Sequence, residues 1–175
     1  ERIFQPLEMS NARTSITQLT ENNNVSSPHQ EIEGEVMVIP ERNFDNVGPA
    51  ASVMASVSDM AKWMIFNLDT PGVYMGNEIV SLKQMEEIFQ PRQSLPLNDP
   101  FTGKITSYGY GWGLQYYEGY RIAQHSGATD GMTSLLVLVP EKELGIIVVS
   151  NLFCNFRPAV RNYILDAMLE IDQDK

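Results

Sequence analysis

The first half of the chain combines helical apolar spacing with polar, irregular segments. A helix of about three turns is predicted after Ser56, with Asp59 three residues later as in a capping motif. Its apolar positions follow at helical spacing, at Met60, Ala61, Met64 and Leu68. A second capping box at residues 81–84 predicts a shorter helix that Pro91 ends.

Polar segments precede the first of these helices. Residues 18–35 contain an Asn run, Ser-Ser-Pro and a glycine, and they predict a surface loop. A very short strand is predicted around Val36–Ile39, and residues 48–51 predict a turn.

The second half changes to the period of strands. A Gly- and aromatic-rich strand is predicted over residues 110–117, with a tight turn at Glu118-Gly119 and a returning strand over 120–125. A second antiparallel pair is predicted over residues 134–139 and 146–151. A closing helix is predicted from about Pro158 to Glu170, and its apolar face is expected at Val160, Tyr163, Ile164, Ala167 and Met168.

The order of these elements predicts an α+β fold, with a helical, loop-rich part followed by an antiparallel sheet and a C-terminal covering helix. Residues 91–107 contain three prolines and have no periodicity, so we place a subdomain boundary there. Residues 1–105 are then part of a helical subdomain, and residues 106–175 supply sheet strands and the last helix.

Composition narrows the classes of function. Of the 175 residues, 43% are hydrophobic and 19% are charged, so general disorder is not expected. The formal net charge of −10 argues against affinity for nucleic acid, which requires clustered Lys and Arg. The longest aliphatic run, residues 135–139, is far short of the roughly 20 residues that span a bilayer. One Cys and two His match no metal-site spacing, and no cofactor is predicted.

The main candidate for chemistry is the segment His125-Ser126-Gly127-Ala128-Thr129-Asp130-Gly131. Gly127 has no Cβ, so a ligand can approach its backbone closely, and the N–H of Ala128 could serve as one donor of an oxyanion hole. The alternative is a Gly-containing turn between two strands, with a histidine that has a structural partner. Both interpretations remain open at this point.

Two other arrangements are rejected. Ser126 as a nucleophile with His125 as its base is not expected, because neighbouring side chains on a strand point to opposite faces and the chain has no G-x-S-x-G elbow. The Ser58-Asp59-Met60 segment lacks the Asn of an S-D-N motif, and it lies where Ser and Asp commonly cap helices. His29 lies in a polar segment, where a surface residue without a partner is expected.

Several segments together resemble the serine β-lactamase-like hydrolases, which include class C β-lactamases, D-alanyl-D-alanine carboxypeptidases and related esterases. Residues 1–9 (ERIFQPLEM) resemble the helix end after the family's second motif, and residues 48–64 (GPAASVMASVSDMAKWM) resemble the loop and helix that follow. Residues 108–113 (YGYGWG) resemble the entry into a sheet strand, and His125-Ser126-Gly127 is similar to the third motif, K-T-G or H-[ST]-G.

The resemblance implies roles for four residues. His125 stands where Lys or His supports the electrostatics of the nucleophile, and Ser126 stands where a hydroxyl contacts the substrate's carboxylate or the proton relay. With Gly127, Ser126 would contact the substrate, and Ala128 would supply an oxyanion-hole N–H. The implied reaction is acyl transfer through an acyl-serine intermediate. A His at this position favours the peptidase-like or esterase-like members.

The nucleophile motif S-x-x-K and the second motif Y-x-N do not occur in these residues. We therefore expect the C-terminal part of such a hydrolase, incomplete at its N-terminus and without covalent catalysis of its own. Its sheet should then have an open edge through which the chain can associate with other chains. The implied substrate is a β-lactam, a D-alanyl peptide or a small ester. The resemblance places the parent enzyme in the periplasm or outside the cell, with the cytoplasm as the alternative.

Two functions of other classes remain. One is a non-catalytic peptide- or ligand-binding module that retains the β-lactamase-like scaffold. The other is a plain α+β interaction protein in which H-S-G occurs by chance.

Overall fold

The centre of the protein is an antiparallel six-stranded sheet in the order β10-β9-β8-β7-β6-β5. The computed structural model describes residues 1–19, 24–95 and 106–171. The six strands are β5 (Gln93–Ser94), β6 (Ser107–Tyr108), β7 (Gly113–Tyr117), β8 (Tyr120–Thr129), β9 (Met132–Val139) and β10 (Leu144–Ser150). The hairpins predicted from the period-2 pattern are therefore confirmed as β7–β8 and β9–β10.

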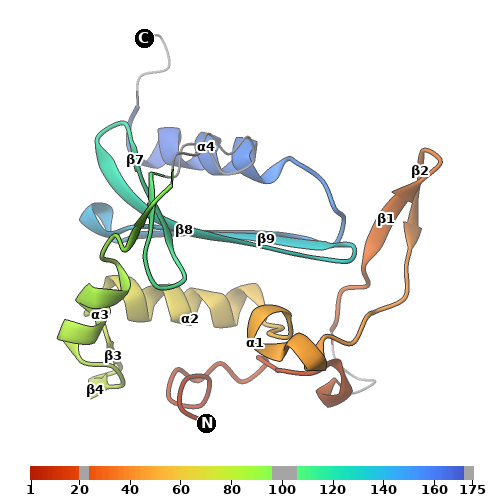
Figure 1. Ribbon diagram of the computed structural model, residues 1–175, viewed down its shortest axis with the longest axis horizontal. Helices are drawn as coiled ribbons and strands as arrows, with labels where there is room; N and C mark the ends of the chain where they lie inside the picture. Colours follow the sequence, from red (N-terminus) through yellow and green to blue (C-terminus); the bar gives the residue numbers. More distant parts are fainter. Residues whose placement is uncertain (20–23, 96–105, 172–175) are drawn as a thin grey trace.

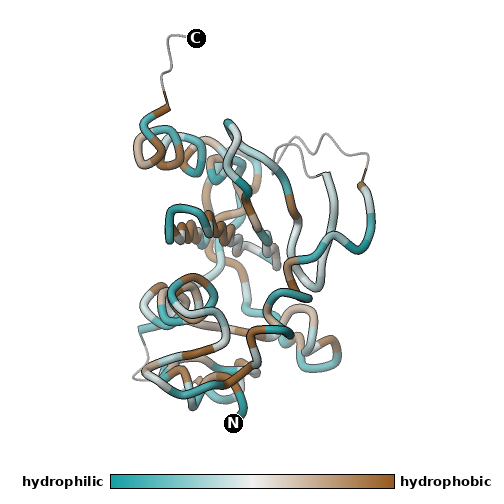
Figure 2. The backbone as a smooth tube through the Cα atoms, turned by 90° about the vertical axis from the view of Figure 1, so that its left-hand side faces the viewer, coloured by the Kyte–Doolittle hydropathy of each residue, from teal (hydrophilic) through white to brown (hydrophobic). Residues whose placement is uncertain are grey.

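Helices cover both faces of this sheet (Figure 1). One face carries α4 (Arg157–Met168) and the other α2 (Val57–Leu68). Figure 2 shows the sheet on edge between the two helices, with its apolar stretches in the middle. The α4 face is packed by Ile122, Leu135, Val137, Val139, Ile146, Val148, Leu165 and Leu169. The α2 face is packed by Met64, Trp112, Leu114, Ala123, Leu136 and Leu138. This alternation along each strand is what a sheet buried on both faces requires.

A third apolar cluster lies on the far side of α2, where the N-terminal segment packs against it and α3 (Leu82–Ile88). Leu7, Phe66 and Met85 are almost completely buried there. Both predicted helix starts are confirmed, because the Ser56 Oγ accepts the N–H of Asp59 and Ser81 forms a capping box with Gln84. The mixed helical and antiparallel architecture agrees with the predicted α+β fold.

The smaller elements lie outside the main layers. A hairpin of β1 (His29–Ile32) and β2 (Glu35–Val38) extends away from the end of the sheet (Figure 1). A second, very short hairpin pairs β3 (Val73–Tyr74) with β4 (Asn77–Glu78). The remaining elements are the short helix α1 (Gly48–Ala51) and three 3-10 turns, η1 (Ile16–Gln18), η2 (Asp45–Val47) and η3 (Pro140–Lys142).

Three boundary predictions were wrong. Residues 29–32 form a strand rather than a loop, because they pair with β2, which lies one residue earlier than the strand predicted around Val36–Ile39. Residues 48–51 form a helical turn, since Pro49 occupies the start of a helix where its missing N–H costs nothing. The strand predicted from residue 110 begins only at Gly113, because Gly111 has a positive φ of 81° that interrupts extended backbone.

The apolar face predicted for the last helix was also wrong in part. Tyr163 and Met168 are 73% and 59% exposed, while Leu165 and Leu169 are buried together with Arg157 and Arg161. Charged side chains on a helix usually lie on its exposed face. Both arginines are buried here because their guanidinium groups donate to oxygen atoms of the sheet. The helix ends at Met168, two residues before the predicted end. Residues 172–175 lie outside the described residues.

The division at residues 105 and 106 stays a prediction. Most of the segment 91–107 on which it was placed, residues 96–105, lies outside the described residues. The sheet also takes its edge strand β5 from before that division.

Candidate active site

Strand β8 carries the H-S-G segment, and it is longer than its neighbour β7. Pairing with β7 runs from Tyr120 to Gln124, which lies opposite Gly113. Pairing with β9 on the other side continues to Thr129. Residues 125–129 therefore have a strand partner on one side only within the part of the chain that the structure describes.

The direction of the backbone groups along this free edge follows from the β7–β8 turn. Glu118 and Gly119 have φ values of 46° and 88°, as in a two-residue type I′ turn. Such a turn pairs Tyr117 with Tyr120 by hydrogen bonds, and hydrogen-bonded pairs then alternate along the ladder. The N–H and C=O groups of Gln124, Ser126 and Ala128 thus all point to the β7 side of β8. Because β7 pairs with β8 only as far as Gln124, the groups of Ser126 and Ala128 point to the free edge.

Side chains alternate along β8 as well. Ile122 lies in the α4-side core and Ala123 in the α2-side core. The same alternation places His125 on the α2 side and Ser126 on the α4 side. Both residues are exposed. His125 has an aromatic neighbour, Tyr108, at 6.4 Å between ring centroids with an interplanar angle of 59°.

Gly127 leaves space for the hydroxyl group of Ser134, which the sequence analysis did not identify as a site residue. A Cβ on Gly127 would lie 2.5 Å from the Oγ of Ser134, which is directly opposite on β9. The structure therefore brings a second serine next to the H-S-G segment. The signal in the sequence is weak, because Ser134 is one of two neighbouring polar residues, with Thr133, at the start of a strongly apolar strand.

A buried arginine contacts the same strand pair. Arg157 is only 8% exposed, at the start of α4. Its Nη1 donates to the carbonyl oxygen of Ser134 at 2.6 Å and to that of Gly127 at 3.2 Å. No sequence pattern identified this residue, because it is separated from Gly127 by 30 positions and only the packing of α4 on the sheet joins them.

A buried polar network lies along the α4 face of the sheet. Arg161 donates from Nη1 to Gln124 Oε1 at 2.7 Å, and burial lowers the pKa of its guanidinium. Nearby, the hydroxyl of Tyr117 donates to Asp166 Oδ1 at 2.5 Å. Burial, and then this bond to the carboxylate, raises the pKa of Tyr117 to about 12. These contacts join α4 to β8 through Gln124 and to β7 through Tyr117.

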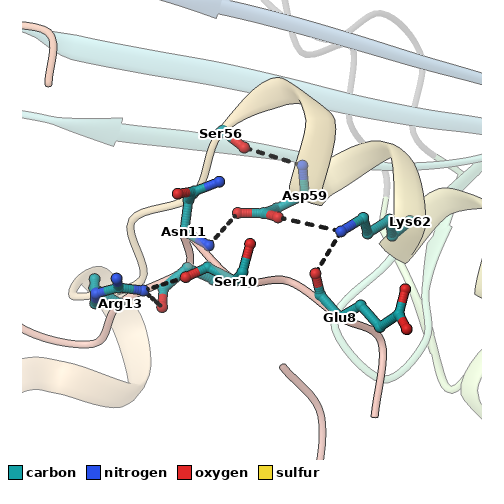
Figure 3. Close-up of polar contacts among 8 residues, drawn as sticks. Glu8, Ser10, Asn11, Arg13, Ser56, Asp59 and Lys62 are labelled. Carbon is teal, nitrogen blue, oxygen red and sulfur yellow. Dashed lines mark hydrogen bonds and ion pairs between the residues drawn. The ribbon is translucent and has the colours of Figure 1, made fainter. Parts of the chain in front are cut away.

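Asp59 of the Ser58-Asp59-Met60 segment makes structural contacts at the start of α2, as predicted (Figure 3). The carboxylate of Asp59 is 1% exposed and accepts the backbone N–H of Asn11 at 3.0 Å. The Nζ of Lys62 lies 3.9 Å from Asp59 Oδ1 and also donates to the carbonyl of Glu8. The cluster thus fastens the N-terminal segment to the first turn of α2.

The prediction for His29 was wrong, since this residue is half-buried and has partners. Its Nδ1 lies 2.8 Å from the carbonyl oxygen of Ser27 and 3.1 Å from that of Asn151. The backbone at His29 packs on Gly131, where an added Cβ would lie 2.7 Å from the His29 nitrogen. His29 therefore fixes the β1–β2 hairpin to the end of the sheet.

No group of three or more His, Cys, Asp or Glu side chains in the described ranges is arranged to hold a metal ion. A surface hollow is lined by Glu1, Arg2, Ile3, Phe4, Ala12, Arg13, Thr14 and Gln18, and it shares no residue with the H-S-G segment.

Comparison with known proteins identifies the class of this fold. The beta-lactamase family model matches residues 1–169. An octameric penicillin-binding protein homologue from Pyrococcus abyssi superimposes with a TM-score of 0.78 at 21% identity, covering 99% of this chain and 37% of that one. A D-amino acid amidase from Ochrobactrum anthropi superimposes with a TM-score of 0.68 at 20% identity, covering 97% of this chain and 48% of that one. The fold is thus that of the serine β-lactamase and transpeptidase superfamily.

The chain belongs to the beta-lactamase family. It is 25% identical to an unguisins hydrolase of Aspergillus campestris, over 100% of this chain and 33% of that protein. The chain therefore spans about a third of the length of that curated relative. The family resemblance expected from residues 1–9, 48–64, 108–113 and 125–127 is confirmed. Among the described residues, no helix is both long and apolar enough to cross a membrane.

Proposed function

We propose that this chain supplies the third motif of a serine hydrolase that cleaves an amide or ester, and that the nucleophile lies outside these residues. The free edge of β8 carries the proposal, because it presents the N–H groups of Ser126 and Ala128 where no strand of the described part of the chain competes for them. The absence of S-x-x-K and Y-x-N from the 175 residues supports a nucleophile located elsewhere. The match to the beta-lactamase family supports the hydrolase class.

In the proposed reaction, a serine oxygen attacks the carbonyl carbon of the substrate and forms a new C–O bond. The bond to the leaving amine or alcohol then breaks, and the leaving group takes the proton that the serine lost. Water attacks the acyl-serine, releases the acid and restores the serine hydroxyl. The N–H of Ala128 donates to the oxygen on which negative charge develops in both steps.

The other motif residues have roles around this donor. His125 supports the electrostatics of the nucleophile, and its exposure leaves it accessible to a substrate or a neighbouring segment. Ser126 and Gly127 contact the substrate along the strand edge. The substrates we propose are a β-lactam, a D-alanyl peptide or a small ester. The amidase among the structural neighbours acts, by its name, on D-amino acid amides, which is compatible with an amide substrate.

An Ala128→Pro variant tests the proposal directly. Proline removes the N–H of residue 128, and this N–H points to the free edge, so no bond of the β8–β9 ladder is lost. In the complete gene product, acylation by a fluorescent penicillin or fluorophosphonate should fall about 10²- to 10³-fold, the cost of removing one oxyanion donor. An Ala128→Gly variant keeps the N–H and is the matched control.

The same probes locate the nucleophile. We expect no label on the 175-residue chain alone, and in the complete gene product a label on a serine outside these residues. A label mapped to one of the chain's own serines would refute the proposed location. Normal acylation of Ala128→Pro would refute the role of Ala128.

A non-catalytic binding module on the same scaffold is the second candidate, favoured by the absence of the nucleophile motif from these residues. It requires that the complete gene product bind the penicillin or the ester reversibly, without acylation at any serine. Mass spectrometry of the intact protein after incubation separates the two functions, since only the hydrolase gains the mass of the acyl group.

We also propose self-association through the open edge of the sheet. Strand β10 pairs only with β9 among the described residues, and this edge is seven residues long and mostly apolar. The Pyrococcus abyssi homologue is octameric. Sedimentation should detect concentration-dependent association, and Val149→Lys should weaken it because a charge on an edge strand opposes pairing. A monomer at every concentration would contradict this proposal.

A further inference from the structure

Arg157 is an unusual residue for the position it occupies. It is 8% exposed, and no carboxylate lies within ion-pair distance of it in the described parts of the chain. Its Nε has no hydrogen-bond partner there either. A buried charge is costly unless it is paired or hydrogen-bonded. Within residues 1–19, 24–95 and 106–171, this guanidinium donates to the carbonyl oxygens of Gly127 and Ser134 alone.

One of these carbonyl groups belongs to the candidate active site. The C=O of Gly127 and the N–H of Ala128 are parts of the same planar peptide group, and in a trans peptide they point in opposite directions. The C=O of Gly127 points toward β9 and Arg157. The N–H of Ala128 therefore points to the free edge of β8, where the substrate carbonyl is proposed to bind.

We propose that Arg157 is a positioning residue that polarises the Gly127–Ala128 peptide group and so strengthens the Ala128 N–H as a hydrogen-bond donor. A cation bonded to the carbonyl oxygen draws electron density away from the amide nitrogen, which makes the N–H more acidic. Hydrogen bonds in such a chain strengthen one another, and a charged donor strengthens them most. The catalytic part of this inference rests on the proposed function, whereas the polarisation itself does not.

The expected size of the effect follows from two general magnitudes. Cooperative polarisation strengthens a hydrogen bond by about 10–30%, and loss of an entire oxyanion donor slows acyl transfer about 10²- to 10³-fold. We apply the fraction of about 10–30% to the logarithm of this rate factor of about 10² to 10³. Removing the charge of Arg157 should then slow acyl transfer about two- to eightfold.

The polarisation is measured on the 175-residue chain by NMR. The amide ¹⁵N shift of Ala128 reports the charge on the Gly127 carbonyl, because the two atoms share one peptide group. We expect Arg157→Met to move the ¹⁵N resonances of Ala128 and Leu135 upfield, since Leu135 follows the second acceptor, Ser134. Arg157→Lys should restore part of the shift at one or both positions. Arg121→Gln, an exposed position on the same strand, is the control for the change in net charge.

The catalytic consequence is measured on the complete gene product with a p-nitrophenyl ester and its thionoester, in which sulfur replaces the carbonyl oxygen. Sulfur accepts hydrogen bonds weakly, so Arg157→Met should lower kcat about two- to eightfold for the ester and less for the thionoester. A merely structural role for Arg157 would lower both rates equally. Arg157→Lys should recover part of the ester rate.

The outcomes distinguish the two proposals. An unchanged Ala128 ¹⁵N resonance in Arg157→Met would overturn the polarisation. A shifted resonance with equal losses for ester and thionoester would overturn its catalytic consequence. Absence of any hydrolysis by the unmodified gene product would refute the proposed function and leave the NMR result as the test of the polarisation. If Arg157→Met fails to fold, the comparison is made with Arg157→Lys and Arg157→Gln.

Discussion

The carboxylate of Asp59 is expected to hold the N-terminal segment on the body of the protein, and replacing it with alanine should be strongly destabilising. Asp59 is 1% exposed, and its Oδ2 accepts the backbone N–H of Asn11 from 48 residues away (Figure 3). Alanine removes this bond and the contact with Lys62 at 3.9 Å. The helix cap itself is retained, because Ser56 Oγ bonds the backbone N–H of residue 59.

The magnitude follows from these contacts. A hydrogen bond to a charged group contributes about 1.5–3 kcal/mol, and an ion pair with a partly exposed lysine adds about 0.5 kcal/mol. A carboxylate in the first turn of a helix adds about 0.3–1 kcal/mol, while relief of the desolvation of the charge offsets part of the total. We expect Asp59→Ala to lower the free energy of unfolding by about 2–3 kcal/mol, which corresponds to about 4–12 °C in Tm for a chain of this length.

Urea and thermal unfolding followed by circular dichroism measure this loss, and hydrogen exchange at the Asn11 amide shows whether the segment is released. Asp59→Asn should cost less than Asp59→Ala, because the amide oxygen can still accept the Asn11 N–H. Asp69→Ala, at the exposed other end of α2, is the matched control and should stay within about 0.5 kcal/mol. A loss below about 1 kcal/mol for Asp59→Ala, or equal losses for the two Asp59 variants, would refute the reasoning.

Three further predictions concern other contacts. Gly131→Ala should release the β1–β2 hairpin from the sheet, because the added Cβ would lie 2.7 Å from the His29 nitrogen and residue 131 has a positive φ of 68°. Unchanged hydrogen exchange at the His29 amide would contradict this prediction. Gly145→Ala should lower the free energy of unfolding by about 1 kcal/mol, because the added Cβ would lie 2.8 Å from the flexible Sδ of Met64. If the loss is the same when Met64→Ala is already present, the contact with Met64 is not its cause. Burial, and then the hydrogen bond to the Asp166 carboxylate, raises the pKa of Tyr117 to about 12 in the folded state. The unfolded chain therefore loses the Tyr117 proton at a lower pH than the folded chain does. The free energy of unfolding should fall as the pH rises from about 10 to about 12. Tyr117→Phe should flatten that part of the stability curve, and an unchanged slope would contradict the assignment.

The elements that the sequence predicted best are those decided by neighbouring residues. Ser56 and Ser81 begin helices because their hydroxyls bond N–H groups only three residues away. The β7–β8 hairpin is equally local, since Glu118-Gly119 adopts the positive φ angles that a two-residue turn requires. The ordered family motifs also indicated the correct family, because they depend on residue types and their order along the chain.

The predictions that failed concern residues whose surroundings come from distant parts of the chain. The predicted apolar face of α4 included Tyr163 and Met168, which are exposed, while Arg157 and Arg161 are buried because the sheet supplies oxygen acceptors for them. His29 lay in a segment with no visible partner, and its partners Ser27 and Asn151 meet only after the hairpin docks.

The sequence by itself therefore determined the helix caps, the tight turn, the strand pairs and the H-S-G segment with its family. Each of these depends on interactions within a few residues or on a pattern of residue types. Only the tertiary structure decided which edge of β8 is free, which hydroxyl lies against Gly127 and which cation bonds its carbonyl. Those three features depend on the lengths of neighbouring strands and on the docking of α4, and non-local packing of this kind leaves no periodic signal in one sequence.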